Sequence, residues 1–430
     1  MPRYLLCSTP IQGHVAPMLA IGRRLVERGH VVTMITGTRF RGAVEGIGAE
    51  HRPLKGAADY DDQTLQEDDE EGQKLSLRLI REGMETIFVL PIPEQADAIS
   101  RAMDDLAPDA ILVDSAFMGV IPFLLDAPAT RPPVLAAGVV PLSQSSADVG
   151  PIGLGLPPAT SMAGRLRNRA LNALLANVVF RPVQQLADRI LEDLGRPPLD
   201  IFVFDFSRLF DRFLQLSPPE FEYPRRDLSA NVRFVGTVLP AALIEAPLPG
   251  WWSELDDERP VVHVSQGTID NHDFGLLVGP TLEALARTDV LVVAATGGRP
   301  IEELGSLPTN ARAAEFLPYD LLFPKTDVFV TNAGFGGVQY ALSHGVPVVA
   351  AGAGADKPDV AMRVQWSGVG LNLKTGRPTP DAIRSAVDRL LGEPGFRLRA
   401  RELAAHIAEL RTLDVIEEEL ATAVSARRSS

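Results

Sequence analysis

The sequence predicts an α/β protein with two Rossmann-like, doubly wound domains that face a cleft. Two short apolar runs, Arg3–Pro10 and Val31–Gly37, flank a stretch with helical spacing, Ala16–His30. A strand, a helix and a strand in so short a segment form a βαβ unit, which implies parallel strands. The same alternation starts again at Val261–Gly267, after a proline-rich stretch without a steady period. Two such series within 430 residues therefore predict two domains.

Further apolar runs extend both series. In the first half, strands are expected at Asp109–Ala116, Pro133–Val140 and Arg233–Pro240. In the second half, they are expected at "DVLVVAATGG", "ARAAEFLP", "DVFVTNAG" and "PVVAAGAG". Gly29 follows the first helical pattern and is expected to end that helix, because glycine adopts the left-handed conformation of a helix stop.

These runs predict the domain boundaries. The first domain is expected over residues 1–238, an interdomain linker over 239–260 and the second domain over 261–394. Helices are expected over 395–430, packing back on the first domain. Residues 151–206 mix a Gly/Pro loop with an amphipathic helix and indicate an insertion that shapes a pocket. The acidic stretch 59–71 is interpreted as a solvated, mobile loop.

Composition excludes several classes of function. A net charge of −14 and a pI of about 5.1 argue against nucleic acid and weakly against an anionic membrane surface. The single cysteine, Cys7, allows no disulfide within the chain. No apolar run is long enough for a transmembrane helix, and the start lacks the regions of a signal peptide. We therefore expect a cytoplasmic protein without stable membrane insertion, and we allow for a homodimer.

A glycine-rich turn in the second half predicts an anion site. Gly334, Gly336 and Gly337 follow an apolar strand and precede a helical pattern. Glycines let a ligand approach the backbone, and the start of a helix directs free N–H groups at it, which favours phosphate or diphosphate. The alternative is that the glycines serve a tight turn alone. Asp356 and Lys357, after the next strand, are expected beside the same cleft to bind sugar hydroxyls, unless they belong to a solvated loop.

The first half offers a general base. His14 lies in the turn after the first strand, where it is expected to be exposed at the cleft. Its near-neutral pKa suits proton transfer. Asp114 ends a later strand at the same sheet edge, and a carboxylate there can fix the histidine tautomer. The alternative is that His14 merely caps a turn. The positions of His30, His263 and His344 indicate structural roles.

Five segments carry a family resemblance: "GHVAP", "ILVDSAF", "VSQGT", "FLPYDLLFPKTDVFVTNAGFGGVQYALSHGVP" and "GADKP". In this order and at this spacing they resemble the inverting nucleotide-sugar glycosyltransferases of family 1, which have the GT-B fold. The bacterial macrolide and natural-product enzymes are the most similar type. The resemblance spans nearly the whole chain.

The resemblance implies a role for each matching residue. His14 would be the base that activates the acceptor, and Asp114 its partner. Three residues would lie beside the acceptor: Gln12, Gly13 and Phe117. The donor would be bound by the phosphate turn Gly267 and Thr268, by Phe316 and Leu317 at the base, by the diphosphate loop Asn332, Gly334, Gly336, Gly337 and Val338, and by Asp356 and Lys357 at the sugar. Neither a metal nor a cofactor is implied.

Three positions depart from the family pattern. Asn332 replaces the usual histidine of the diphosphate loop, Phe316 replaces the usual stacking tryptophan, and Lys357 replaces the usual glutamine of the sugar pair. The preferred base and sugar are therefore less transferable than the fold and the reaction.

The expected reaction is transfer of a sugar, with inversion, from a UDP- or dTDP-sugar to a hydroxyl of a lipophilic acceptor such as a polyketide, macrolide or aromatic aglycone. Its partners would be this nucleotide diphosphate sugar and a small lipophilic acceptor. Two alternatives stay open. One is a nucleotide-sugar epimerase on the same architecture, and the other is a non-catalytic auxiliary partner of a glycosyltransferase.

Overall fold

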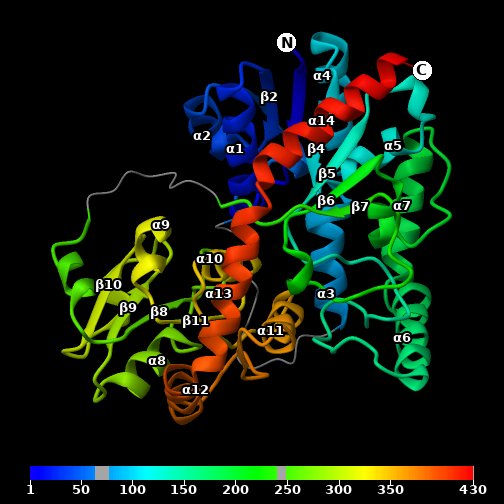
Figure 1. The fold of residues 1–430 in the computed structure, drawn as a ribbon. Helices are drawn as coiled ribbons and strands as arrows, with labels where there is room; N and C mark the ends of the chain where they lie inside the picture. Colours follow the sequence, from blue (N-terminus) through cyan, green and yellow to red (C-terminus); the bar gives the residue numbers. More distant parts are fainter. Residues whose placement is uncertain (63–76, 240–247, 430) are drawn as a thin grey trace.

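The computed structural model describes residues 1–62, 77–239 and 248–429. It contains two wholly parallel sheets, each covered by helices, in two units that lie side by side (Figure 1). The two doubly wound units that the sequence predicts are therefore present.

The first sheet has seven strands in the order β3-β2-β1-β4-β5-β6-β7. Its strands are β1 (Arg3–Cys7), β2 (Val31–Thr36), β3 (Glu50–Pro53), β4 (Ala110–Asp114), β5 (Val134–Gly138), β6 (Arg212–Gln215) and β7 (Val232–Phe234). Its helices are α1 (Gln12–Glu27), α2 (Arg41–Gly46), α3 (Leu77–Met84), α4 (Ile92–Leu106), α5 (Ile121–Leu124), α6 (Met162–Leu174) and α7 (Arg181–Asp193).

The second sheet has six strands in the order β10-β9-β8-β11-β12-β13. Its strands are β8 (Val261–Ser265), β9 (Leu291–Ala295), β10 (Ala311–Ala314), β11 (Val328–Thr331), β12 (Val348–Ala350) and β13 (Gly370–Asn372). The helices of this part are α8 (Val278–Leu285), α9 (Tyr319–Leu322), α10 (Phe335–Ser343), α11 (Lys357–Trp366), α12 (Pro380–Gly392), α13 (Pro394–Glu409) and α14 (Thr412–Ser429).

Strands with continuous apolar runs agree best with the sequence prediction. β1, β4, β5, β8 and β9 are apolar and nearly fully buried, as expected of central parallel strands. The edge and short strands β3, β6 and β13 have mixed sequences and were not predicted. Gly29 has φ of +83° and ends the first helix, as predicted.

The first helix begins earlier than the sequence predicts. It starts at Gln12 rather than Ala16, because the Ile11 carbonyl already accepts hydrogen bonds from the N–H groups of His14 (2.8 Å) and Val15 (2.9 Å). Gly13 and Pro17 obscure this first turn in the sequence, because glycine and proline are both unfavourable inside a helix. His14 is therefore a helix residue.

The acidic stretch differs from its prediction where the structure describes it. The Asp59 carboxylate accepts hydrogen bonds from the N–H (2.7 Å) and the hydroxyl (2.6 Å) of Thr38. Asp62 is 2% exposed and pairs with Arg39. The beginning of the stretch is therefore bonded rather than solvated, and residues 63–71 lie outside the described part of the chain.

The linker prediction is described only in part, because residues 240–247 lie outside the described ranges. Trp251, Trp252 and Leu255 pack against Val261 and Leu291 of the second sheet. This end of the stretch therefore contributes to the core of the second unit.

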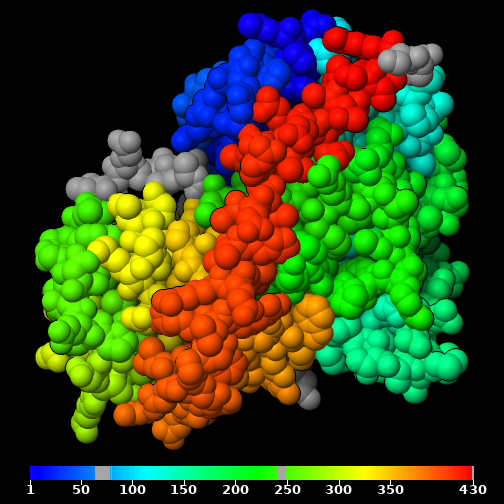
Figure 2. All heavy atoms as spheres, in the orientation of Figure 1, coloured from blue at the N-terminus to red at the C-terminus, as the bar shows by residue number. Residues whose placement is uncertain are grey.

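The C-terminal helices cross from one unit to the other, as Figure 2 shows. Leu403 and Ile407 of α13 belong to the core beside β11 and β12. Ile416, Leu420 and Val424 of α14 belong to the core on one face of the first sheet. The last helix thus ties the second unit back to the first.

No helix in the described ranges is both long and apolar enough to cross a membrane.

Candidate active site

Both sheets contain a topological switch point, which is where open parallel sheets bind their ligands. In the first sheet it lies between the neighbouring strands β1 and β4, where Cys7 pairs with Val113. In the second sheet it lies between β8 and β11, where Ser265 pairs with Thr331. Most of the residues that the sequence singled out follow these four strands, whereas Phe316 and Leu317 follow β10, and Asp356 and Lys357 follow β12.

His14 and Asp114 meet at the first switch point. His14 Nδ1 lies 3.1 Å from Asp114 Oδ1. Asp114 is fully buried and also accepts hydrogen bonds from Ser8 Oγ (3.1 Å), Thr9 N–H (2.5 Å) and Ala116 N–H (2.6 Å). These donors fix the carboxylate, and the carboxylate in turn orients the imidazole so that Nε2 is the ring nitrogen left for a substrate.

The prediction that His14 is exposed is wrong. The residue is 9% exposed, because the first turn of α1 brings it over the buried end of β4. A base in this position is shielded from bulk water.

The residues expected beside the acceptor divide into two groups. Gln12 and Gly13 lie at the start of α1, and a Cβ on Gly13 would meet no atom within 4 Å, so space is open there. Phe117, in contrast, is fully buried in the core of the first unit. Phe117 therefore packs in the core and does not face the acceptor, contrary to the expectation.

Asp62 supports the first site and was missed by the sequence analysis. Its carboxylate accepts the N–H of Gln12 at 2.7 Å, which is one of the free donors at the start of α1. The signal was hidden because Asp62 belongs to an acidic run, whose usual behaviour is solvation.

The second switch point begins with the turn after β8. Gly267 has φ of +78°, which favours glycine, and both Gly267 and Thr268 are exposed. Gln266 holds the turn: its amide donates to the Asp270 carbonyl (3.0 Å), and its oxygen accepts the N–H of Val278 (3.0 Å). The turn that is expected to bind phosphate is therefore exposed to a ligand, and the hydrogen bonds of Gln266 hold its conformation.

The loop after β9 closes one side of this turn and was not predicted. A Cβ on Gly297 would lie 2.1 Å from the Gly267 carbonyl oxygen, so only glycine fits. Asn271 Nδ2 donates to the Gly297 carbonyl at 3.1 Å and joins the two loops. The glycine pair in "ATGGRP" was the available signal.

The glycine-rich turn after β11 leads directly into α10. The helix begins at Phe335, so the N–H groups of Phe335, Gly336 and Gly337 form its first turn, and Gly336 is exposed. Val338 differs from the prediction, because its N–H donates to the Gly334 carbonyl (3.1 Å) and its side chain is fully buried. The N–H groups that have no partner within the helix thus end at Gly337.

Asn332 occupies this turn in an unexpected way. Its Nδ2 donates to the Gln266 carbonyl at 2.6 Å, and its Oδ1 accepts the N–H of Gly334 at 3.3 Å. The side chain therefore connects the β8 turn to the β11 turn. The expected contact with a phosphate is replaced by a role in holding the two turns together.

Phe316 and Leu317 lie between β10 and α9. Phe316 is 46% exposed, and its ring lies over Gly298, where a Cβ would come within 2.8 Å of Cζ. Leu317 is partly buried and packs beside Val293 and Leu322. Phe316 thus presents an accessible aromatic face near the second switch point, and Leu317 fixes the segment that carries it.

Asp356 and Lys357 stand at the start of α11. Lys357 pairs with Asp270 of the β8 loop. Burial raises the pKa of the Asp356 carboxyl, while its own backbone N–H and the charge of Arg363 act to lower it. In the same helix, Asp359 accepts the N–H of Gly153, so the start of α11 lies against a loop of the first unit.

His263 is a structural residue, as the sequence indicates. It is fully buried, and its ring stacks on Phe329 with centroids 5.1 Å apart. Nδ1 lies 2.8 Å from the Val293 carbonyl, and Nε2 lies 3.2 Å from the Tyr319 hydroxyl. Burial lowers the pKa of His263 to about 4, so the ring is neutral at physiological pH.

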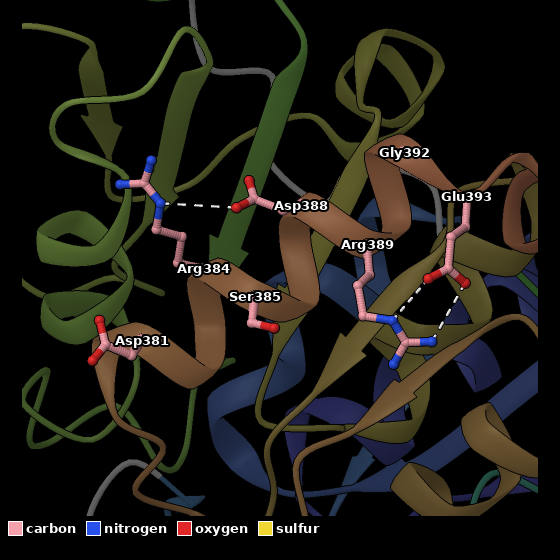
Figure 3. A pocket seen from close by; sticks show the side chains of 7 residues that line it. All are labelled: Asp381, Arg384, Ser385, Asp388, Arg389, Gly392 and Glu393. Atoms are coloured by element: carbon pink, nitrogen blue, oxygen red, sulfur yellow. Dashed lines mark hydrogen bonds and ion pairs between the residues drawn. The ribbon is translucent and has the colours of Figure 1, made fainter.

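A pocket on α12 is lined by Asp381, Arg384, Ser385, Asp388, Arg389, Gly392 and Glu393 (Figure 3), none of which follows a strand of either switch point. Its charged side chains pair along the helix: Arg389 Nε lies 2.9 Å from Glu393, and Arg384 Nε lies 3.8 Å from Asp388. Such pairs are typical of a solvated helix face. In the described ranges, no group of three or more His, Cys, Asp or Glu residues is arranged to hold a metal ion.

Comparison with known proteins identifies the family. Residues 280–419 match the family described as erythromycin biosynthesis protein CIII-like, C-terminal domain. The chain is 40% identical over 421 residues to 4′-demethylrebeccamycin synthase of Lentzea aerocolonigenes. This alignment covers 96% of this chain and 99% of that protein. It is 36% identical over 417 residues to UDP-glycosyltransferase 2 of Phaeomoniella chlamydospora, covering 94% and 91% respectively.

The fold agrees with this result. The crystal structure of the glycotransferase of kitacinnamycin matches with a TM-score of 0.73 and 24% identity, over 97% of this chain and 99% of that chain. The architecture is therefore GT-B. Because two relatives with at least 30% identity align along almost their whole length, the chain is a glycosyltransferase and belongs to the family 1 natural-product glycosyltransferases.

Proposed function

We propose that this enzyme transfers a sugar from a UDP- or dTDP-sugar to a hydroxyl of a lipophilic natural product, with inversion at the anomeric carbon. The observation that carries the proposal is the His14–Asp114 pair at the first switch point, in which a fully buried carboxylate lies 3.1 Å from the imidazole. A relative named 4′-demethylrebeccamycin synthase supports a natural-product acceptor, and one named UDP-glycosyltransferase supports a UDP-sugar.

The proposed reaction is a single displacement. His14 Nε2 takes the proton of the acceptor hydroxyl while the acceptor oxygen attacks the anomeric carbon. The bond between that carbon and the diphosphate oxygen breaks, and its electron pair leaves with the nucleotide diphosphate. Asp114 stabilises the imidazolium that forms, because its carboxylate is fixed on Nδ1.

The negative charge on the leaving group would be stabilised by the start of α10. The backbone N–H groups of Phe335, Gly336 and Gly337 are oriented before substrate arrives. Fixed donors of this kind stabilise developing charge without reorganisation. We propose that this turn acts without a metal ion, and that activity therefore persists in excess EDTA. Activity that EDTA abolishes and Mg²⁺ or Mn²⁺ restores would contradict this part of the proposal.

The acceptor side would be formed by the start of α1 and by the Gly/Pro loop at residues 151–158. Gly153 of this loop donates its N–H to Asp359 of α11, so the loop contacts the second unit. Exposed Leu154 gives the loop an apolar side chain that suits a lipophilic acceptor.

Two measurements test the proposal. UDP-sugars and dTDP-sugars are first screened for thermal stabilisation, because a ligand that binds the native state raises the melting temperature. The donor that binds is then supplied with a radiolabelled sugar and a panel of aromatic and polyketide aglycones. A labelled glycoside of inverted configuration supports the proposal. A labelled isomer of the donor without any acceptor would instead support an epimerase, and no turnover with any donor would favour an auxiliary protein.

A further inference from the structure

Helix α6 exposes a row of apolar side chains. Met162, Leu166, Leu174 and Val178, which we call the α6 stripe, are 81%, 69%, 49% and 62% exposed. Their spacing in multiples of four residues places them along one side of the helix and of the π-helical turn that continues it, Leu175–Val179. A surface helix normally buries its apolar side, so this orientation is reversed.

The reversed orientation is fixed by polar side chains on the inner side. Asn168 is fully buried and donates its amide to the Ala147 carbonyl at 3.2 Å. One turn later, Asn172 donates to the Ser146 carbonyl at 2.9 Å. Ser161 caps the helix by accepting the N–H of Gly164 at 3.1 Å. Turning the helix so that the stripe faces inward would break these hydrogen bonds, so they keep the apolar side chains exposed.

Arginines flank the α6 stripe. Helical spacing places Arg165 and Arg169 on one side of it and Arg167 on the other, where the Arg167 guanidinium also donates to Asn168 Oδ1 at 3.0 Å. No aspartate or glutamate occurs between Asp148 and Asp188, although the whole chain carries 55 acidic residues against 41 basic ones. A basic, apolar surface thus stands on an acidic protein, at the outer edge of the first unit (Figure 1).

The combination of exposed apolar side chains and arginines indicates which kind of partner the α6 stripe fits. Apolar side chains flanked by arginines fit the boundary between lipid headgroups and acyl chains, where arginines extend back to the phosphates. A second copy of the chain fits less well, because a symmetric contact through the stripe would bring the arginines of the two copies together. The remaining acidic surface is repelled by an anionic bilayer, which would orient the enzyme with α6 toward it.

We propose that the α6 stripe and its flanking arginines bind the surface of an anionic lipid bilayer, reversibly and without spanning it. This proposal is independent of the sugar-transfer reaction, because it rests on residues outside both switch points.

The test is flotation of the purified full-length protein with lipid vesicles. We expect roughly 100-fold stronger binding to vesicles of equal phosphatidylcholine and phosphatidylglycerol than to phosphatidylcholine alone, from about 1 kcal/mol per arginine near an anionic surface. Binding should fall at high salt. Leu166→Asp should weaken it at least tenfold, and Arg165→Glu with Arg169→Glu should remove the preference for the anionic lipid.

The chain offers a matched control. Leu398 of α13 lies in the same tripeptide, Arg-Leu-Arg, and is 60% exposed, but Arg397 and Arg399 there pair with Asp327 (2.7 Å) and Glu402 (3.1 Å). Leu398→Asp should bind vesicles as the wild type does. Thermal unfolding and transfer to a water-soluble acceptor should be the same in Leu166→Asp, Leu398→Asp and the wild type.

Three results would overturn the proposal. The first is a wild-type protein that does not float with anionic vesicles at low salt. The second is an equal loss of binding in Leu166→Asp and Leu398→Asp. The third is a dimer, detected by sedimentation, that Leu166→Asp dissociates while vesicle binding stays unchanged; the stripe would then be a contact between copies of the chain.

Discussion

Arg363 of α11 and Glu222, which lies between β6 and β7, form an ion pair that joins the two units of the molecule. Arg363 Nε lies 3.1 Å from Glu222 Oε1, and both side chains are 2% exposed. The guanidinium also lies over the Tyr223 ring, 4.3 Å from its centroid. Because α11 begins with Asp356 and Lys357, this pair fixes the donor-side residues relative to the first sheet.

Removing one partner of this pair should be costly. Burial alone would raise the pKa of Glu222, but Arg363 and Arg225 hold it below its usual value, so the pair is charged. We expect Glu222→Gln to lower the free energy of unfolding by about 3–5 kcal/mol, because it leaves buried arginines without a counter-charge. Denaturant unfolding measures this. Glu393→Gln, which breaks an exposed pair on α12, should have little effect, and equal effects of the two variants would contradict the prediction.

Asp359 should make stability depend on pH. Burial raises the pKa of its carboxyl to about 6, against the opposing charge of Arg363 and the N–H of Gly153. Because the native pKa exceeds the unfolded one, the stabilisation is complete below about pH 4 and is lost as pH rises through about 6. Asp359→Asn does not titrate. Its stability relative to the wild type should therefore rise between about pH 4 and 7.5, by up to about 3 kcal/mol.

Unfolding curves of both proteins across this pH range provide the measurement. A constant difference between Asp359→Asn and the wild type across this range would show that the Asp359 carboxyl has an ordinary pKa.

The His14–Asp114 pair should separate catalysis from binding. His14→Ala should lower kcat by roughly 10²–10⁴ and leave donor affinity unchanged, since general base catalysis has this size. Asp114→Asn should lower kcat less than His14→Ala does, but it should lower the free energy of unfolding more. The reason is that an amide NH₂ would then face the N–H of Thr9 or Ala116. Steady-state kinetics and calorimetry decide this. His406→Ala, on α13, is the control, and wild-type kcat in His14→Ala would refute the assignment.

Asn332 should act on the donor site through the backbone. Asn332→Ala removes its hydrogen bonds to Gln266 and Gly334 and should lower the free energy of unfolding by about 1–3 kcal/mol. Donor affinity should weaken with it, while acceptor affinity should not change. Unfolding and calorimetry are measured on the same preparation. If donor affinity falls without any loss of stability, Asn332 contacts the phosphates directly instead.

Phe316 should determine affinity for the nucleotide base. Phe316→Ala should weaken binding of UDP or dTDP by about 1–3 kcal/mol, the contribution of one stacked base. Phe316→Trp should bind at least as tightly, because the aromatic face lies over Gly298, which has no side chain to displace. Leu321→Ala, similarly exposed on α9, is the control. Calorimetry with both nucleotides checks this, and unchanged affinity in Phe316→Ala would remove Phe316 from the base site.

The sequence by itself determined the local structure and the chemistry of the turns. Apolar runs such as Leu291–Ala295 encode buried parallel strands, because their side chains are covered on both faces of the sheet. The glycines after β11 and the histidine after β1 follow from the same alternation. Family motifs then assigned the reaction, which the relatives support.

Tertiary structure decided which of these residues meet. His14 and Asp114 are separated by 100 positions, and β4 lies beside β1 because of packing between distant segments, which local periodicity does not encode. In the same packing, His14 and Phe117 become buried, and the Asn332 amide comes within hydrogen-bonding distance of the Gln266 carbonyl. The sequence predicts a solvated Asp62, because its neighbours are acidic, but in the folded chain its carboxylate accepts a hydrogen bond from the start of α1. A side chain's exposure and partners depend on every element packed around it, whereas helical and strand periodicity depend on neighbours along the chain.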